Sequence, residues 1–122
     1  MAAPNLVNVS SIYGKTMGAA LSTTTTTSLL ANASGSNKLL KINSIIVSNV
    51  DGSNAADATI SWYNGTTDYR LARTVAVPAD STLVVIGKDA PIYLEENHSI
   101  RGGASAASDL EIVISYEELD DA

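Results

Sequence analysis

Short runs in which hydrophobic and polar residues alternate recur along most of the chain, and no helical period is sustained. The clearest examples are residues 58–62 and 110–116, where every second residue is apolar or aromatic. A period of two predicts strands with one buried face and one solvated face. In the first of these strands, Trp62 is expected to point into the core.

The run from Lys38 to Val50 contains two alternating sets of opposite parity, separated near Asn43. The first set is Leu40 and Ile42, and the second is Ile45 and Val47. An extra residue in a strand produces such a switch, so the pattern predicts a β-bulge near Asn43. A strand that changes faces in this way can serve two different partners.

Several other segments have strand composition. The threonine-rich residues 21–30 predict a polar strand at a sheet edge, because β-branched residues suit a pleated strand. The dipeptide Asn64-Gly65 predicts a tight hairpin of type I′, with Tyr69–Val77 as the return strand. Residues 82–86 form an apolar run that suggests burial on both faces, and residues 102–108 are expected to be a connection.

Strand signals separated by turn signals roughly every ten residues are typical of an all-β domain. We therefore predict a single antiparallel β-sandwich, jelly-roll-like, with about seven or eight strands. Residues 1–20, which contain glycines and have no sustained period, are expected to form an extended N-terminal arm. Residues 21–122 are expected to form the sandwich, which ends in a short acidic tail at residues 117–121.

The composition narrows the classes of function. Apolar residues make up 45% of the 122-residue chain and charged residues 16%, which is enough apolar material for one core. The formal net charge of −6 opposes binding to nucleic acid. The chain has no cysteine, no run of apolar residues long enough to span a membrane and no signal-peptide pattern, so we expect synthesis in a cytoplasm and no membrane partner.

Candidate catalytic and metal-binding residues are few. His98 is the single histidine, and the neighbouring residues 95–96 are adjacent carboxylates that point to opposite faces in an extended strand. Asp51, Asn54 and Asp57 could offer oxygen ligands to calcium, but they lack the spacing of a calcium loop. The sequence therefore predicts no catalytic residue, no cofactor site and no metal site.

Four segments carry a resemblance to a known group of proteins. They are Ile45-Ile-Val-Ser-Asn-Val-Asp-Gly52, Val77-Pro-Ala-Asp-Ser81, Ala90-Pro-Ile-Tyr-Leu-Glu-Glu96 and Ile114-Ser-Tyr-Glu-Glu118. In these segments the chain resembles small virion structural proteins of tailed phages, especially marine and cyanobacterial ones. The resemblance implies a capsid decoration (cement) protein in the virion, which binds the major capsid protein or other virion proteins and forms a homo-oligomer, with a trimer favoured.

The arm has apolar residues that need a place to pack. Leu6, Val7, Val9 and Ile12 are expected to contact a partner subunit, and packing of the arm on its own domain is the alternative. Two other functions remain open from the sequence. The first is a neck, tail or fibre component of the virion, and the second is a carbohydrate-binding module or adhesin.

Overall fold

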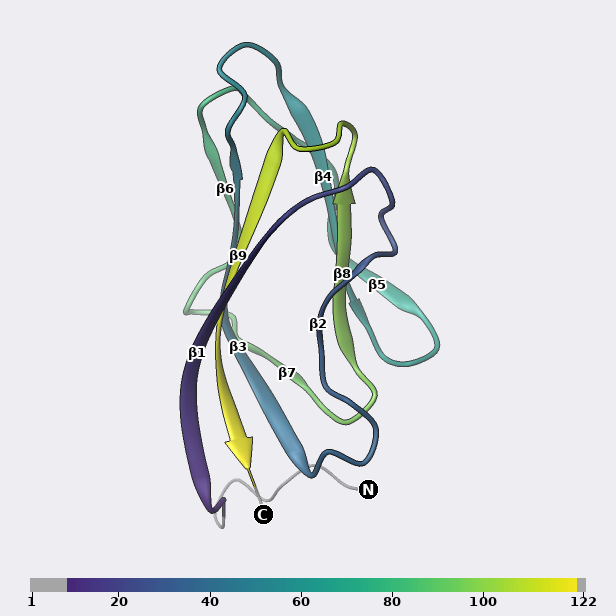
Figure 1. Cartoon of the computed structure of the whole chain (residues 1–122), viewed down its shortest axis with the longest axis vertical. Helices are drawn as coiled ribbons and strands as arrows, with labels where there is room; N and C mark the ends of the chain where they lie inside the picture. The colour runs from purple at the N-terminus through teal and green to yellow at the C-terminus, as the bar shows by residue number, and fades with distance from the viewer. Residues whose placement is uncertain (1–8, 121–122) are drawn as a thin grey trace.

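The computed structural model describes residues 9–120 and shows two antiparallel sheets packed face to face (Figure 1). Within these residues the chain forms nine strands: β1 (Ser11–Ala20), β2 (Ser28–Ala31), β3 (Lys38–Asn49), β4 (Ala56–Tyr63), β5 (Asp68–Val77), β6 (Thr82–Ile86), β7 (Ile92–Leu94), β8 (Ser99–Ala104) and β9 (Leu110–Asp120). This confirms the predicted all-β sandwich. No helix that could cross a membrane is found in this part of the chain.

The strand order is that of a jelly roll. Sheet A has the order β1-β9-β3-β6, with β7 also pairing with β3, and sheet B has the order β2-β8-β4-β5. If β6 and β7 are counted as one interrupted strand, the pairs β1·β9, β2·β8, β3·β6/β7 and β4·β5 form a nested set that rolls into two sheets. The predicted jelly-roll-like sandwich is therefore present with eight strands in this sense.

The alternation of β3 shifts by one residue where the sequence predicts a bulge. Its register against β9 shifts between Ile42 and Ser44, on either side of Asn43. Both apolar sets consequently face the core, and Ile42, Ile45 and Val47 have no exposed surface. β3 also has two successive partners along its other edge, because its first half pairs with β7 and its second half with β6.

The core lies between the two sheets. Sixteen buried hydrophobic residues from both sheets form one cluster, which includes Ile60 and Ile100 of sheet B and Ile112 and Ile114 of sheet A. Trp62 packs against this cluster and is only partly buried. Removal of this much aliphatic surface from water is the main driving force for folding of the domain.

The strand predicted over the threonine-rich residues 21–30 is shorter than expected. Only Ser28–Ala31 is a strand, and residues 22–27 form a loop. Threonine hydroxyls stabilise that loop, since Thr27 donates to the carbonyl oxygen of Thr24 from both its amide (3.2 Å) and its hydroxyl (2.8 Å). Local side-chain hydrogen bonds of this kind compete with strand pairing, and here they override the β-propensity of threonine.

Three smaller predictions are also wrong. The hairpin after β4 is not a two-residue turn, because the amides of Thr66 and Thr67 donate to Oδ1 of Asn64 and make a four-residue loop. β6 is buried on one face only, and Val84 is 61% exposed because its side chain lies on the outer face of sheet A. The connection expected at residues 102–108 starts later, since β8 continues to Ala104.

The segment predicted to be an arm has two parts. Residues 1–8, with Leu6 and Val7, lie outside the described residues. Ser11–Ala20 is β1, which pairs with all ten facing residues of β9 without a register shift. β1 forms one edge of sheet A in Figure 1, so this half of the predicted arm contributes a strand to the sandwich.

Candidate functional site

The outer face of sheet A has a row of apolar residues that crosses four strands. Val84 of β6 pairs with Ile46 of β3, Ile46 pairs with Val113 of β9, and Val113 pairs with Gly18 of β1. Val84 is 61% exposed and Val113 is 37% exposed. We call these four residues the β6–β1 row.

The residues next to this row differ on its two sides. On one side, the same face continues with Ser44, Ser115 and Thr16, which pair with one another across β3, β9 and β1. On the other side lies the carboxylate Glu111, which lines a hollow of about 310 Å³ together with Gly18 of the row. An apolar row next to a hollow is the kind of surface that packs against another protein, and Glu111 places one charge beside it.

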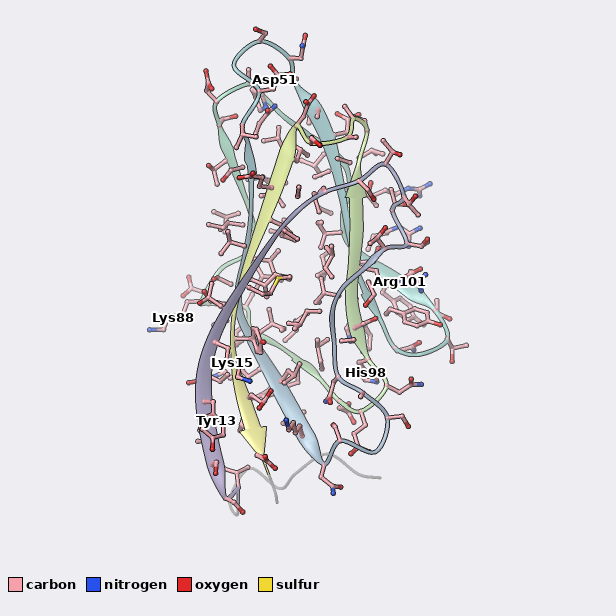
Figure 2. The ribbon with its side chains drawn as sticks, in the orientation of Figure 1. Tyr13, Lys15, Asp51, Lys88, His98 and Arg101 are labelled. Atoms are coloured by element: carbon pink, nitrogen blue, oxygen red, sulfur yellow. The ribbon has the colours of Figure 1, made fainter. Side chains whose placement is uncertain are left out.

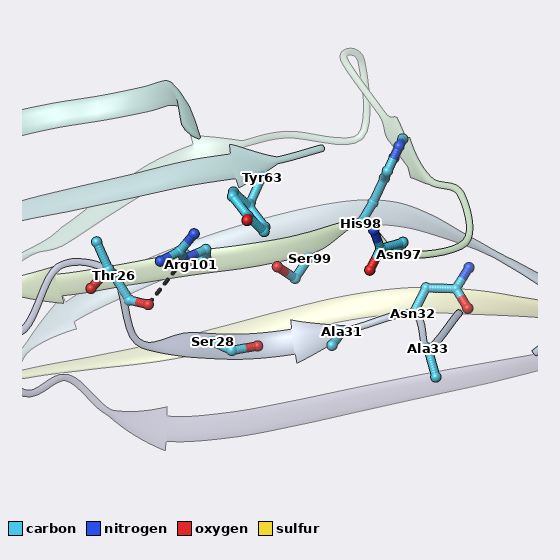
Figure 3. Close-up of a pocket in the computed structure, with 10 residues that line it drawn as sticks. All are labelled: Thr26, Ser28, Ala31, Asn32, Ala33, Tyr63, Asn97, His98, Ser99 and Arg101. Atoms are coloured by element: carbon cyan, nitrogen blue, oxygen red, sulfur yellow. Dashed lines mark hydrogen bonds between the residues drawn. The ribbon is translucent and has the colours of Figure 1, made fainter. Parts of the chain in front are cut away.

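Sheet B has a polar pocket of about 400 Å³ on its outer face (Figure 3). Its floor includes Ser28 of β2, Ser99 and Arg101 of β8 and Tyr63 of β4, with Asn97 at one end. Ile100 is fully buried in the core, so its neighbours on β8 point the opposite way, towards this pocket.

Arg101 is the only charged residue that lines this pocket among the residues that the structure describes. Its Nε donates to the carbonyl oxygen of Thr26 at 3.0 Å, and its guanidinium lies 4.1 Å from the centre of the Tyr63 ring. A third contact joins its Nη1 to Oδ2 of Asp68 at 3.4 Å. These contacts fix the guanidinium and neutralise its charge, so the pocket presents mainly neutral polar groups.

A second, apolar pocket of about 280 Å³ lies where the open edges of the two sheets meet. Trp62, Leu71, Ile92 and Tyr93 line it. The indole of Trp62 stacks on Tyr69 with ring centres 5.7 Å apart, and its Nε1 is buried without a hydrogen-bond partner among the described residues. Apart from the Tyr93 hydroxyl and the Trp62 Nε1–H, the side chains that line this pocket among the described residues are apolar.

The residues considered for catalysis have structural contacts instead. Nδ1 of His98 accepts a hydrogen bond from the amide of Glu95 at 3.2 Å, and the imidazole packs edge-on against Trp62 with ring centres 5.2 Å apart. Within residues 9–120, no three His, Cys, Asp or Glu side chains are grouped so that they could hold a metal ion.

The loop considered for calcium is held by its own hydrogen bonds. Oδ1 of Asp51 accepts from the amides of Ser53 (2.8 Å) and Asn54 (3.3 Å). The hydrogen bond from the amide of Ser53, followed by that from the side chain of Asn54, lowers the pKa of Asp51 below its ordinary value. Asp51 therefore shapes the turn between β3 and β4, at the far end of the molecule from His98 in Figure 2.

The four predicted arm residues have different positions. Leu6 and Val7 are outside the described residues, Val9 is half-buried, and Ile12 is 57% exposed on the outer face of sheet A. Their contact with a partner subunit stays a prediction. The β6–β1 row cannot be predicted from a local sequence pattern, because its members come from four strands and only the register of all four brings them together.

Comparison with known proteins gives little further information. No family model matches the sequence, and no curated protein matches it either. Nine solved chains match, among them two crystal structures of a pentameric capsid protein isolated from metagenomic phage sequences. Each is 16% identical to this chain with a TM-score of 0.36, and the match covers 97% of this chain and 68% or 64% of theirs. A likeness at this level is too low to transfer a function.

Proposed function

We propose that this chain is a non-enzymatic structural protein of a phage virion, specifically a capsid decoration (cement) protein. Four segments of the sequence resemble small virion proteins of tailed phages, and the jelly roll is an architecture that capsid domains use. The observation that carries the proposal is the β6–β1 row, which gives the domain an exposed apolar strip for a protein partner.

In this proposal the outer face of sheet A contacts the outside of the capsid. The partner is the major capsid protein or another virion protein, and Ile12 extends the contact at the start of β1. The protein is made in the host cytoplasm and is incorporated into the virion. It forms a homo-oligomer, with a trimer favoured because a three-fold axis of the capsid repeats one surface three times.

The experiment measures binding of purified protein to heads that lack it, with aspartate placed in the β6–β1 row. Val84→Asp and Val113→Asp should each weaken binding by roughly tenfold or more, because a charge would be buried in an apolar contact. Val50→Asp is the matched control, since Val50 is 52% exposed but lies in the turn after β3. Equal binding by all three variants would refute a role of this face.

The same experiment distinguishes decoration from a place in the neck, tail or a fibre. Decoration predicts that labelled protein covers the whole head in electron micrographs. Label found only at one vertex or along the tail would keep the structural role and move its location.

A second candidate is a carbohydrate-binding module or adhesin, which the polar pocket of sheet B favours. Neutral hydroxyl and amide groups at Ser28, Ser99 and Asn97, beside an aromatic ring, are groups that bind sugars. However, the Arg101 guanidinium lies over the Tyr63 ring and reduces the ring surface left for stacking. A glycan array settles the matter, because binding to a defined sugar that is lost in Ser99→Val would support this function and an empty array would reject it.

A further inference from the structure

The turn between β4 and β5 contains Asn64, which is the one asparagine of the sequence that is followed by glycine. Its Oδ1 accepts hydrogen bonds from the amides of Thr66 (3.0 Å) and Thr67 (2.8 Å). The ring that the hydrogen bond to Thr66 closes includes the backbone nitrogen of Gly65. The side-chain amide of Asn64 is therefore held on the side of the chain where this nitrogen can attack it.

The backbone nitrogen of Gly65 is free to react. Within residues 9–120 its amide donates no hydrogen bond, whereas the amides of the two residues that follow it both do. An amide outside the hydrogen-bond network loses its proton to solvent more readily than a bonded one. Glycine also has no Cβ to obstruct the approach of its nitrogen to the neighbouring side chain, and it readily adopts the φ of 93° found here.

The same two hydrogen bonds activate the carbonyl group of the Asn64 side chain. When a nucleophile adds to Cγ, negative charge develops on Oδ1, and two amide donors already point at this atom. Donors placed where an oxyanion develops lower the barrier of acyl-transfer reactions. The turn thus holds a nucleophile, an electrophile and two oxyanion donors in four consecutive residues.

We propose that Asn64 is a site of spontaneous modification, at which the folded chain converts this residue to aspartate and isoaspartate. The nitrogen of Gly65 forms a bond to Cγ of Asn64, and the bond from Cγ to Nδ2 breaks. Nδ2 leaves as ammonia with the proton that Gly65 loses, and a cyclic succinimide remains. Water then opens this ring. Cleavage of the bond from nitrogen to Cγ gives aspartate, and cleavage of the bond to the main-chain carbonyl carbon gives isoaspartate.

Asp51 shows that the aspartate product fits such a turn. It is also followed by glycine, and its Oδ1 accepts from the amides of Ser53 (2.8 Å) and Asn54 (3.3 Å), the second and third residues after it. The two turns therefore share one hydrogen-bond pattern, with a carboxylate in one and an amide in the other. The hydrogen bond from Ser53 lowers the pKa of Asp51 further below neutral. An ionised carboxylate is a poor electrophile, so Asp51 should not form the succinimide.

Isoaspartate, in contrast, should disturb the turn after β4. The main chain then runs through the former side chain of residue 64, so the loop gains one backbone atom. Gly65 has little room to move, because a Cβ there would already lie 2.5 Å from Nδ2 of Asn97 and 3.2 Å from its carbonyl oxygen. Asn97 lines the polar pocket of sheet B (Figure 3), so a shift of Gly65 would also move one wall of that pocket.

The first test follows the purified full-length protein in mildly alkaline buffer by peptide mass mapping. Exchange of ammonia for water raises the mass of the peptide that contains Asn64 by about 1 Da. Asn54 is the internal control, because it is exposed in a turn but is followed by alanine. Asn64 should react roughly tenfold faster than Asn54 or more, since a Cβ on the next residue hinders ring closure. Equal rates, or an unchanged Asn64, would overturn the proposal.

The second test separates the reactivity of the folded turn from that of the bare dipeptide. Folded protein should react at least as fast as protein unfolded in urea, because only the fold keeps both amide donors on Oδ1 of Asn64. Asp51→Asn places an asparagine before glycine in the matching turn and should create a second reactive site in the folded protein. Reaction that needs urea, or a variant that stays unreactive at residue 51, would refute the role of the turn.

The third test compares the two products. Asn64→Asp should keep the melting temperature of the wild type and show no change of mass with time, because a carboxylate accepts the same two amides. Isoaspartate protein, separated by ion exchange and identified with an isoaspartyl methyltransferase, should melt at least about 4 °C lower, since hydrogen bonds of the turn are lost. Equal melting of the two forms, or an absence of methyltransferase substrate after the mass change, would contradict this course of the reaction.

Discussion

Replacement of Gly103 by alanine tests how closely the loop before β2 passes over sheet B. A Cβ atom at Gly103 would lie 2.7 Å from the carbonyl oxygen of Thr24 and 2.9 Å from that of Ser22. Both contacts are with backbone atoms, which cannot rotate away as a side chain can. The loop is also tied to β8, because the amide of Ala104 donates to Ser22 at 2.8 Å.

The expected cost follows from these distances. Overpacking of a tight site costs about 1–3 kcal/mol, and a stretched loop hydrogen bond adds about 1 kcal/mol. The lower entropy of unfolded alanine offsets about 0.5–1 kcal/mol. The free energy of unfolding should therefore fall by about 1–3 kcal/mol, which corresponds to a fall in Tm of roughly 4–12 °C for a domain of this size.

The assay is thermal unfolding followed by far-UV circular dichroism, with Gly14→Ala as the matched control. Gly14 lies in β1 and has no atom within 4 Å of its added Cβ, so its replacement should leave Tm unchanged or raise it slightly. If Gly103→Ala melts at the wild-type temperature or above, the close approach of the loop to β8 is wrong. If both variants lose the same stability, the loss comes from the loss of glycine and not from the contact.

Three further predictions concern single side chains. Asn32→Ala should lower the free energy of unfolding by about 2–3 kcal/mol in chemical denaturation. The buried Nδ2 of Asn32 donates to the carbonyl oxygens of Lys38 and Leu94, and both oxygens would lose a partner. A loss below about 0.5 kcal/mol would contradict this role. Asp51 has a lowered pKa in the folded state, so its contribution to stability is complete above the unfolded pKa of about 3.9 and is lost as the pH falls through the lower folded value. Melting curves of the wild type and Asp51→Asn should accordingly converge in strong acid, and a constant difference at every pH would refute this linkage. Arg101→Lys should release the loop at Thr26, since lysine lacks the Nε–H that donates to the carbonyl oxygen of Thr26. The amide of Gly102 donates to the carbonyl oxygen of Thr27 in the same loop, so its hydrogen exchange should become faster. The control variant Arg73→Lys should leave this exchange rate unchanged.

Local patterns in the sequence predict the strands well where side chains alternate between core and solvent. The bulge near Asn43 could be placed because Leu40 and Ile42 change parity to Ile45 and Val47, and all four side chains must reach one core. β1 has no such pattern, since its outer positions include Gly14 and Gly18 and its inner positions include Lys15. The predicted arm therefore includes a strand whose pairing depends on β9, almost one hundred residues away in the sequence.

The surfaces were harder to predict than the strands. The β6–β1 row takes one residue from each of four strands, and pairing partners cannot be read from a local period. Val84 and Ile46 are far apart in the sequence, so only the observed register brings them side by side.

The interruption between β6 and β7 has a consequence for engineering of the domain. β6 and β7 pair separately with the two halves of β3, and the connecting turn at Gly87–Ala90 carries the exposed Lys88, which projects from the edge of sheet A in Figure 2. Since each strand keeps its own register, a peptide inserted at Lys88 would lengthen a surface turn without sliding either strand. The domain thus contains a natural display position, where foreign sequences could be added on the rim of the sandwich while both sheets keep their pairing.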